Sequence, residues 1–164
     1  MDLSTKKIIW GQFGAAIDTL ENAINACPDD LWFDNSQYHQ YWYIASHALF
    51  WLDYYLSEDT EKFKPPAPFG MEEMDPAGVI PDPPYSKEQL LAYLEHNRKK
   101  CRDSIFSMTD ELADKPHNFR KGSICFAELL LYGMRHVQHH AAQLNLILRQ
   151  KNDIGSPWVF QAKI

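Results

Sequence analysis

The chain is organised around the stretch RHVQHHAAQ, residues 135–143, in its last long amphipathic segment. His136 and His140 are four positions apart, so on a helix they lie one above the other on the same face. Their Cβ atoms are then about 5–6 Å apart, which lets two imidazole nitrogens share one divalent ion at about 2.0–2.1 Å each. Gln143 continues this stripe one turn further on. Two histidines do not complete a metal site, and the best candidate for a third ligand is His47, inside another strongly apolar segment.

The overall composition limits the class of protein. A chain of 164 residues with a formal net charge of −6 is most simply one domain, residues 1–164, and is ill suited to binding nucleic acid through its phosphates. Its densest basic patch is interpreted as the solvated face of a helix: Lys99, Lys100 and Arg102. Three scattered cysteines without a CxxC pair predict neither a disulfide framework nor a zinc ribbon. We see no signal-peptide core and no apolar run of bilayer length, so we expect a cytoplasmic protein without a membrane partner.

Apolar spacing predicts two helices in the first third of the chain. The first begins at Ser4 or Thr5 and ends before Pro28, because the residue preceding a proline is pushed out of the helical conformation. The second, residues 37–56, is apolar around most of its circumference, which indicates a central place in a bundle, a subunit interface or both. The short connection between them has three consecutive apolar side chains that we expect to anchor it to the core: Leu31, Trp32 and Phe33.

A proline-rich segment, residues 57–85, separates the second helix from the third. Its prolines forbid regular helix, and its length lets it cross a whole helix of about 30 Å, so helices 2 and 3 can run parallel. The third helix opens with the capping box SKEQ at residues 86–89. Ser123 is the candidate N-cap of a fourth helix, and the tail 157–160 is expected to pack back on the bundle. The prediction is an all-α, four-helix bundle without strands, with a long proline-rich crossover between helices 2 and 3.

The histidines of the last helix lie in a stripe of otherwise apolar or small residues, so their ring nitrogens need partners. Leaving a buried polar group without a partner costs on the order of 1–3 kcal/mol. One alternative is side-chain hydrogen bonding inside the core. The other, favoured by three such histidines on two core helices, is a shared metal ion. Three neutral imidazoles suit Zn²⁺, Ni²⁺, Fe²⁺ or Mn²⁺, and three protein ligands leave a position open for water or substrate, as in catalytic sites.

Better-known metal motifs do not fit the sequence. A zincin requires His-Glu-x-x-His, but Val137 follows His136. A ferritin-like di-iron bundle requires Glu-x-x-His pairs, and no histidine of this chain has a glutamate three positions before it. A haem held between His47 and a histidine of the last helix stays open, although the chain has no attachment motif.

Other side chains are weaker candidates for the site. His139 lies about 100° round the helix from His140, which favours a supporting or surface role over metal binding. The candidates for a pocket beside the metal are aromatic residues one helical turn from the proposed ligands, although helical aromatics are more often core: Tyr43, Trp51 and Tyr132. The remaining histidines are interpreted as surface residues: His39, His96 and His117.

One histidine inside the second helix, together with His-x-x-His-His-x-x-Gln in the last, resembles the DinB/YfiT-like superfamily. The resemblance covers nearly the whole chain, including the crossover and the tryptophan-containing tail. It implies a homodimer that holds a divalent metal ion, Zn²⁺ or Ni²⁺ before Fe²⁺ or Mn²⁺, on His47, His136 and His140. Gln143 matches the glutamine that commonly follows the ligands. Ala142 stands where many relatives have glycine, and Arg135 precedes the first ligand of this helix.

The resemblance also implies a metal-dependent enzyme that acts on a small molecule. Relatives include S-transferases that use low-molecular-weight thiols such as bacillithiol or mycothiol, and others described as hydrolases. A metal on three neutral ligands lowers the pKa of water to about 7 and favours a thiolate, so no protein nucleophile is required. No acid/base carboxylate is recognisable near the histidines, which motivates an alternative function, a non-catalytic metal- or ligand-binding bundle acting in stress response. A third alternative is a plain helical dimer with core histidines.

Overall fold

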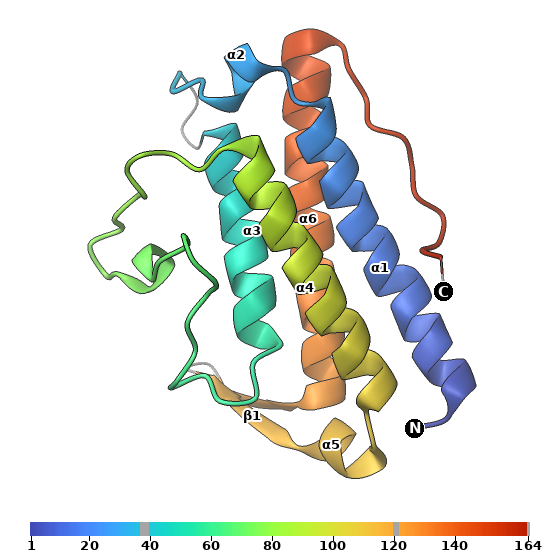
Figure 1. Ribbon diagram of the computed structural model, residues 1–164. Coiled ribbons are helices and arrows are strands. Elements are labelled where there is room, and N and C mark those ends of the chain that lie inside the picture. Colours follow the sequence, from blue (N-terminus) through green and yellow to red (C-terminus); the bar gives the residue numbers. More distant parts are fainter. Residues whose placement is uncertain (37–39, 120–121, 164) are drawn as a thin grey trace.

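Four long helices lie side by side in the computed structural model, which describes residues 1–36, 40–119 and 122–163 (Figure 1). They are α1 (Leu3–Ala26), α3 (Tyr41–Tyr55), α4 (Lys87–Ser107) and α6 (Phe126–Asn152). Helices α1 and α6 run in one direction, and α3 and α4 run in the other. The consecutive long helices α3 and α4 are therefore parallel, as the length of the crossover between them permits. The all-α class is confirmed.

Helix α1 begins at Leu3 because Asp2 caps it, and the Asp2 carboxylate accepts a hydrogen bond from the Thr5 amide (2.8 Å). It ends at Ala26, before Pro28, as predicted. Its apolar stripe packs against α4 and α6, and its innermost side chains are fully buried: Ile17, Leu20, Ala23 and Ile24. Burying a side chain of the size of leucine or isoleucine stabilises the fold by about 1.5–3 kcal/mol.

The connection after α1 contains one turn of helix, α2 (Asp29–Trp32). Leu31 and Trp32 are buried, and the Trp32 indole N–H donates to the Tyr85 carbonyl oxygen (3.1 Å). Phe33 is 51 % exposed, so the prediction that it anchors the connection is wrong. Phe33 lies beyond the end of α2 and does not share the face that the helix buries.

Helix α3 begins at Tyr41, with Gln40 at its N-cap, instead of at Gln37. The predicted first residues of this helix, 37–39, lie outside the described residues, and so does His39. Helix α3 packs against both α4 and α6, which buries most of its apolar side chains within the chain. This central place accounts for its apolar circumference, so α3 gives no separate support for a dimer. The homodimer stays a prediction, which light scattering at micromolar concentration can test.

The crossover from α3 to α4 is irregular apart from one 3₁₀ turn, η1 (Glu72–Met74). Aromatic side chains hold it against the helices. Phe63 and Tyr85 are buried, and Phe69 stacks on Tyr93 of α4 with ring centroids 4.3 Å apart. The crossover therefore follows a packed path along the helices and can present side chains to them.

Helix α4 starts with the predicted capping box, which is confirmed. The Ser86 hydroxyl accepts from the Gln89 amide (3.2 Å), and the Gln89 side-chain oxygen accepts from the Ser86 amide (2.8 Å). After α4 the chain makes one short helix, α5 (Asp110–Asp114), capped by the Thr109 hydroxyl.

The segment before α6 is an antiparallel hairpin of β1 (Pro116–Phe119) and β2 (Gly122–Cys125). It corrects two predictions, since the chain does contain strands and Ser123 does not cap the last helix. Ser123 pairs with Asn118 inside the hairpin, and the N-cap of α6 is Cys125. Each strand has only four residues, too short for an alternating apolar pattern to stand out in the sequence. Within the described residues, none of the helices has the length and apolar character that crossing a bilayer requires.

The C-terminal segment returns along α1 (Figure 1). The Ala162 amide donates to the Gly11 carbonyl oxygen (2.9 Å), and a Cβ atom on Gly14 would lie only 2.5 Å from the Ala162 Cβ, so this close approach requires glycine. The tail therefore lies against the bundle as expected, although the side chains of Trp158 and Phe160 are 79 % and 82 % exposed. Backbone contacts and Ala162 attach the tail instead.

Candidate metal centre

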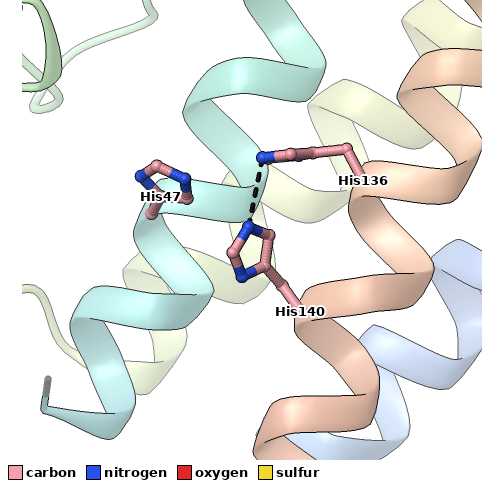
Figure 2. Close-up of side chains that lie close together, drawn as sticks. All are labelled: His47, His136 and His140. Atoms are coloured by element: carbon pink, nitrogen blue, oxygen red, sulfur yellow. Dashed lines mark hydrogen bonds between the residues drawn. The ribbon is translucent and has the colours of Figure 1, made fainter.

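Three histidines from two helices converge in the structure, His47 from α3 and His136 and His140 from α6 (Figure 2). One ring nitrogen of each lies within 4.8 Å of the other two. The four-residue spacing on α6 places Nε2 of His136 3.1 Å from Nε2 of His140. Two nitrogens on one tetrahedral zinc ion would lie about 3.3 Å apart, given zinc–nitrogen distances of about 2.0–2.1 Å. The pair on α6 therefore stands close to a metal-binding separation.

Hydrogen bonds at the far side of two rings fix which nitrogen carries the proton. Gln143 presents its side-chain oxygen to Nδ1 of His140 (2.7 Å), and an amide oxygen only accepts, so Nδ1 donates. The carboxylate of Glu73 likewise accepts from Nδ1 of His47 (2.7 Å). A ring that donates from Nδ1 has its Nε2 on the side where a metal ion would bind.

Glu73 contacts the histidine site and is absent from the residues that the sequence analysis named. It lies on the 3₁₀ turn of the crossover, its side chain is 11 % exposed, and its Oε2 also accepts from the Trp51 indole N–H (3.2 Å). Burial opposes its charged form, but the hydrogen bond and charge of His47, with contacts to Tyr43 and Trp51, outweigh burial and lower its pKa. The expectation that no carboxylate lies near the histidines is thus wrong. No spacing in the sequence links residue 73 to residue 47, and only the path of the crossover brings them together.

The electrostatic surroundings keep two of the histidines neutral. Burial, followed by the charges of His140 and His47, lowers the pKa of His136 to about 3. Burial, followed by the charge of His47, lowers the pKa of His140 to about 4. Nδ1 of His136 is buried without a hydrogen-bond partner among the described residues. Three imidazoles whose ring nitrogens converge on one centre are a donor set that a divalent transition metal prefers, so the residues present fit a metal ion.

Comparison with known protein families identifies the chain. The model of the DinB superfamily matches residues 12–144, a span that contains the three histidines, Glu73 and Gln143. The chain belongs to the DinB superfamily. A comparison with curated proteins gave no match, and neither did a comparison with solved structures.

Aromatic side chains surround the histidines of this DinB-superfamily chain. Tyr43 and Trp51 flank His47, each with its ring centroid 6.3 Å from that of the histidine. Tyr132 does not reach the cluster itself. It contacts Tyr55 (5.2 Å between centroids), and Tyr55 in turn contacts His136 (5.9 Å).

His139 stays outside the group of three that could bind a metal. Its side chain is exposed and its ring meets that of His140 edge-on at 5.0 Å. The structure therefore brings together His47, His136, His140 and Gln143, adds Glu73, and leaves His139 at the edge.

The lowered histidine pKa values predict that acid destabilises the metal-free protein between about pH 6.5 and pH 4. Below the unfolded value of 6.5, the unfolded chain binds protons that His136 and His140 of the folded chain do not, so stability falls with pH. Urea unfolding in the presence of a chelator at pH 7, 6 and 5 measures this fall. A His136→Gln variant should show a shallower dependence, and equal slopes in the two proteins would contradict the prediction.

Proposed function

We propose that this DinB-superfamily protein is a metal-dependent enzyme that acts on a small molecule. His47, His136 and His140 would hold the ion, with Zn²⁺ or Ni²⁺ preferred over Fe²⁺ or Mn²⁺ for a set of three neutral nitrogens. The reaction would be transfer of a low-molecular-weight thiol or hydrolysis. The observation that carries this proposal is the 3.1 Å approach of two Nε2 atoms, one of which belongs to a ring whose Nδ1 proton is held by Gln143.

The ion would supply Lewis acidity, which lowers the pKa of water or of a thiol toward neutrality. The chain's own residues contribute orientation and exclusion of water. Glu73 and Gln143 hold two rings with Nε2 free for the ion, and this second layer of hydrogen bonds commonly strengthens metal binding. The rings of Tyr43 and Trp51 cover the flanks of His47. Oε2 of Glu73 accepts from His47 and from Trp51, so we assign this carboxylate an orienting role.

Replacing Glu73 with glutamine is expected to weaken metal binding about 10–100-fold, the usual effect of losing a partner that orients a ligand histidine. The variant keeps the size of the side chain but removes the negative charge that fixes the Nδ1 proton of His47. Competition with a chromogenic chelator measures the affinity. Glu72→Gln is the matched control, since Glu72 lies on the same 3₁₀ turn without a hydrogen bond to a histidine in the described structure. Equal affinities of the two variants would contradict the orienting role.

The proposed function is tested by loading the purified protein with Zn²⁺ or Ni²⁺ and measuring two reactions. One is conjugation of small thiols to 1-chloro-2,4-dinitrobenzene, and the other is hydrolysis of p-nitrophenyl esters and amides. We expect turnover that needs the metal and disappears in a His140→Ala variant. Full metal occupancy without turnover in either reaction would refute the enzyme and support the alternative, a non-catalytic metal-binding bundle.

A further inference from the structure

A groove of about 670 Å³ borders the histidine cluster, between α1, α6 and the C-terminal segment. His136 is one of its lining residues, so the groove and the candidate metal centre share this residue. Tyr132, which contacts Tyr55 beside His136, lines the groove as well. A molecule lying in this groove would therefore have one end beside the histidines.

Small side chains and an exposed aromatic residue line the groove. Ala15 and Ala16 of α1 and Ala142 of α6 line it, and their short side chains leave room for a ligand. Trp158 also lines the groove and is 79 % exposed. The segment that carries Trp158 is attached to α1 through the bond from the Ala162 amide to the Gly11 carbonyl oxygen, which keeps Trp158 at the edge of the groove.

The charge in the groove is opposite to that of the whole protein. The chain carries a net charge of −6, yet no acidic residue is among the described residues that line the groove. Arg135 does line it, and has no ion-pair partner in the part of the chain that the structure describes. The positions one turn away on α6 are Leu131, Tyr132, Gln138 and His139, none of which is a carboxylate.

Arg98, unlike Arg135, has its charge balanced by neighbouring carboxylates among the described residues. Arg98 is paired with three carboxylates, Asp18, Glu21 and Glu95. An arginine without such partners presents a planar, permanently charged fork that matches a carboxylate in two parallel hydrogen bonds. Arg135 brings this guanidinium group to a groove that apolar and aromatic side chains also line.

We propose that this groove binds a small carboxylate that has an apolar or aromatic body. Arg135 binds the carboxylate, Trp158 contacts the body, and the remaining end of the molecule lies toward His136. If this ligand is the substrate of the histidine site, that role rests on the proposed function. Binding of the anion in the groove does not depend on it.

The test compares 2-naphthoate with 2-naphthamide, which has the same aromatic body without the charge. Isothermal titration calorimetry of the purified full chain, with and without added Zn²⁺, gives both affinities. We expect the wild type to bind naphthoate about tenfold or more tightly than the amide, and Arg135→Gln to remove that preference while leaving the affinity for the amide unchanged. Trp158→Ala should weaken both ligands. Arg102→Gln is the matched control, since Arg102 stacks on Phe106 of α4 outside the groove.

A His140→Ala variant separates this inference from the proposed function. Retained preference for naphthoate in that variant supports the groove even if the metal is lost. Loss of the preference in His140→Ala but not in Arg135→Gln would show that the carboxylate binds a metal ion, and would overturn the inference. So would the absence of binding to the wild type at millimolar ligand. A second copy of the chain in the groove would make naphthoate binding weaken as protein concentration rises, and that result would overturn it as well.

Discussion

Replacing His140 with alanine is expected to lower the affinity for the divalent ion by more than about 100-fold, beyond the effect of losing an orienting residue. The variant removes one of the three nitrogens that converge within 4.8 Å, and two remaining imidazoles on different helices form a poor site. It also leaves Gln143 without the Nδ1 proton that its oxygen accepts. Elemental analysis of protein purified without chelator measures metal content, and chelator competition measures affinity.

The matched control is His139→Ala, one position away on the same helix. His139 is the more exposed residue and is not part of the convergent group, so its loss should leave metal content unchanged. A protein in which the two variants lose metal equally would not bind it as proposed. Unchanged metal content in His140→Ala would refute the three-histidine site outright.

The part of the candidate site on one helix could be predicted from local spacing alone. His136, His140 and Gln143 follow each other at four and three positions, and an α-helix places them on one face whatever the rest of the fold does. Assigning His47 to the site needed two further arguments: a buried histidine needs partners, and the chain resembles a family with a histidine at this place. The position of Glu73 could not be predicted, because it lies 26 positions from His47 and most of the chain between them is an irregular crossover. Proline content shows that a crossover is not helical, but it does not show which side chain it directs inward.

In the fold, too, features set by neighbouring residues could be predicted, and features set by distant contacts could not. The capping box at Ser86 and the end of α1 before Pro28 are set by neighbouring residues, and both were predicted. The exposure of Trp158 was not predicted, because other residues hold the tail: the Ala162 amide bonds to Gly11, and the Trp10 indole donates to the Lys163 carbonyl oxygen. Lys100 also departs from prediction. It was interpreted as part of a solvated helix face, whereas its side chain is only 28 % exposed and reaches a buried carboxylate on α3.

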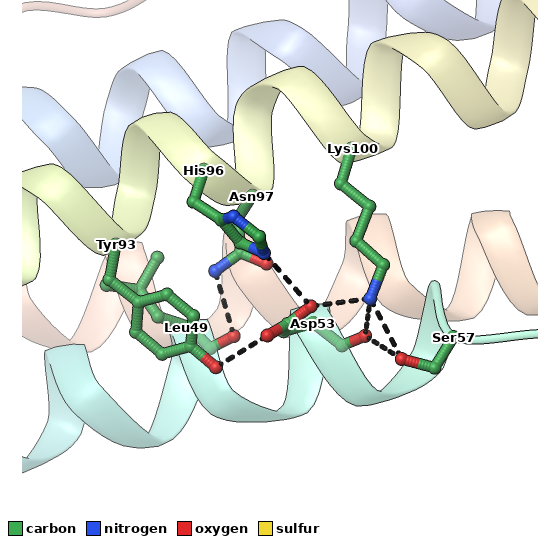
Figure 3. A network of polar contacts seen from close by, with 7 residues as sticks. All are labelled: Leu49, Asp53, Ser57, Tyr93, His96, Asn97 and Lys100. Carbon is green, nitrogen blue, oxygen red and sulfur yellow. Dashed lines mark hydrogen bonds and ion pairs between the residues drawn. The ribbon is translucent and has the colours of Figure 1, made fainter. Parts of the chain in front are cut away.

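That carboxylate, Asp53, is the centre of a polar network between α3 and α4 (Figure 3). Its side chain is 2 % exposed, and its Oδ1 lies 2.6 Å from the Lys100 ammonium. The Tyr93 hydroxyl donates to its other oxygen (3.0 Å), and His96 approaches Oδ1 to 3.6 Å. Lys100 donates as well to the Asp53 carbonyl oxygen (2.8 Å) and to the Ser57 hydroxyl (2.8 Å). The network spans two parallel helices, so it fixes how one is placed along the other.

Replacing Lys100 with methionine is expected to lower the free energy of unfolding by about 3–5 kcal/mol, because removing one partner of a buried ion pair leaves the other charge uncompensated. Asp53 cannot reach solvent, and the Tyr93 hydroxyl and the more distant His96 ring supply less than the ammonium did. Urea unfolding at pH 7 of the metal-free protein measures the loss. A change below about 1 kcal/mol, the range of a surface ion pair, would contradict the role assigned to this contact.

The opposite replacement, Asp53→Asn, should cost less than Lys100→Met, since the two partners are buried to different degrees. Lys100 is 28 % exposed and its flexible side chain can turn its ammonium to water, while asparagine still accepts from the Tyr93 hydroxyl. Lys99→Met is the matched control on the adjacent residue. Lys99 is 77 % exposed and pairs with Asp103 one turn away, a contact that contributes only about 0.3–0.5 kcal/mol. The expected order of destabilisation is therefore Lys100→Met, then Asp53→Asn, then Lys99→Met. The reverse order for the first two would mean that the ammonium, and not the carboxylate, is the charge that the fold cannot leave unpaired.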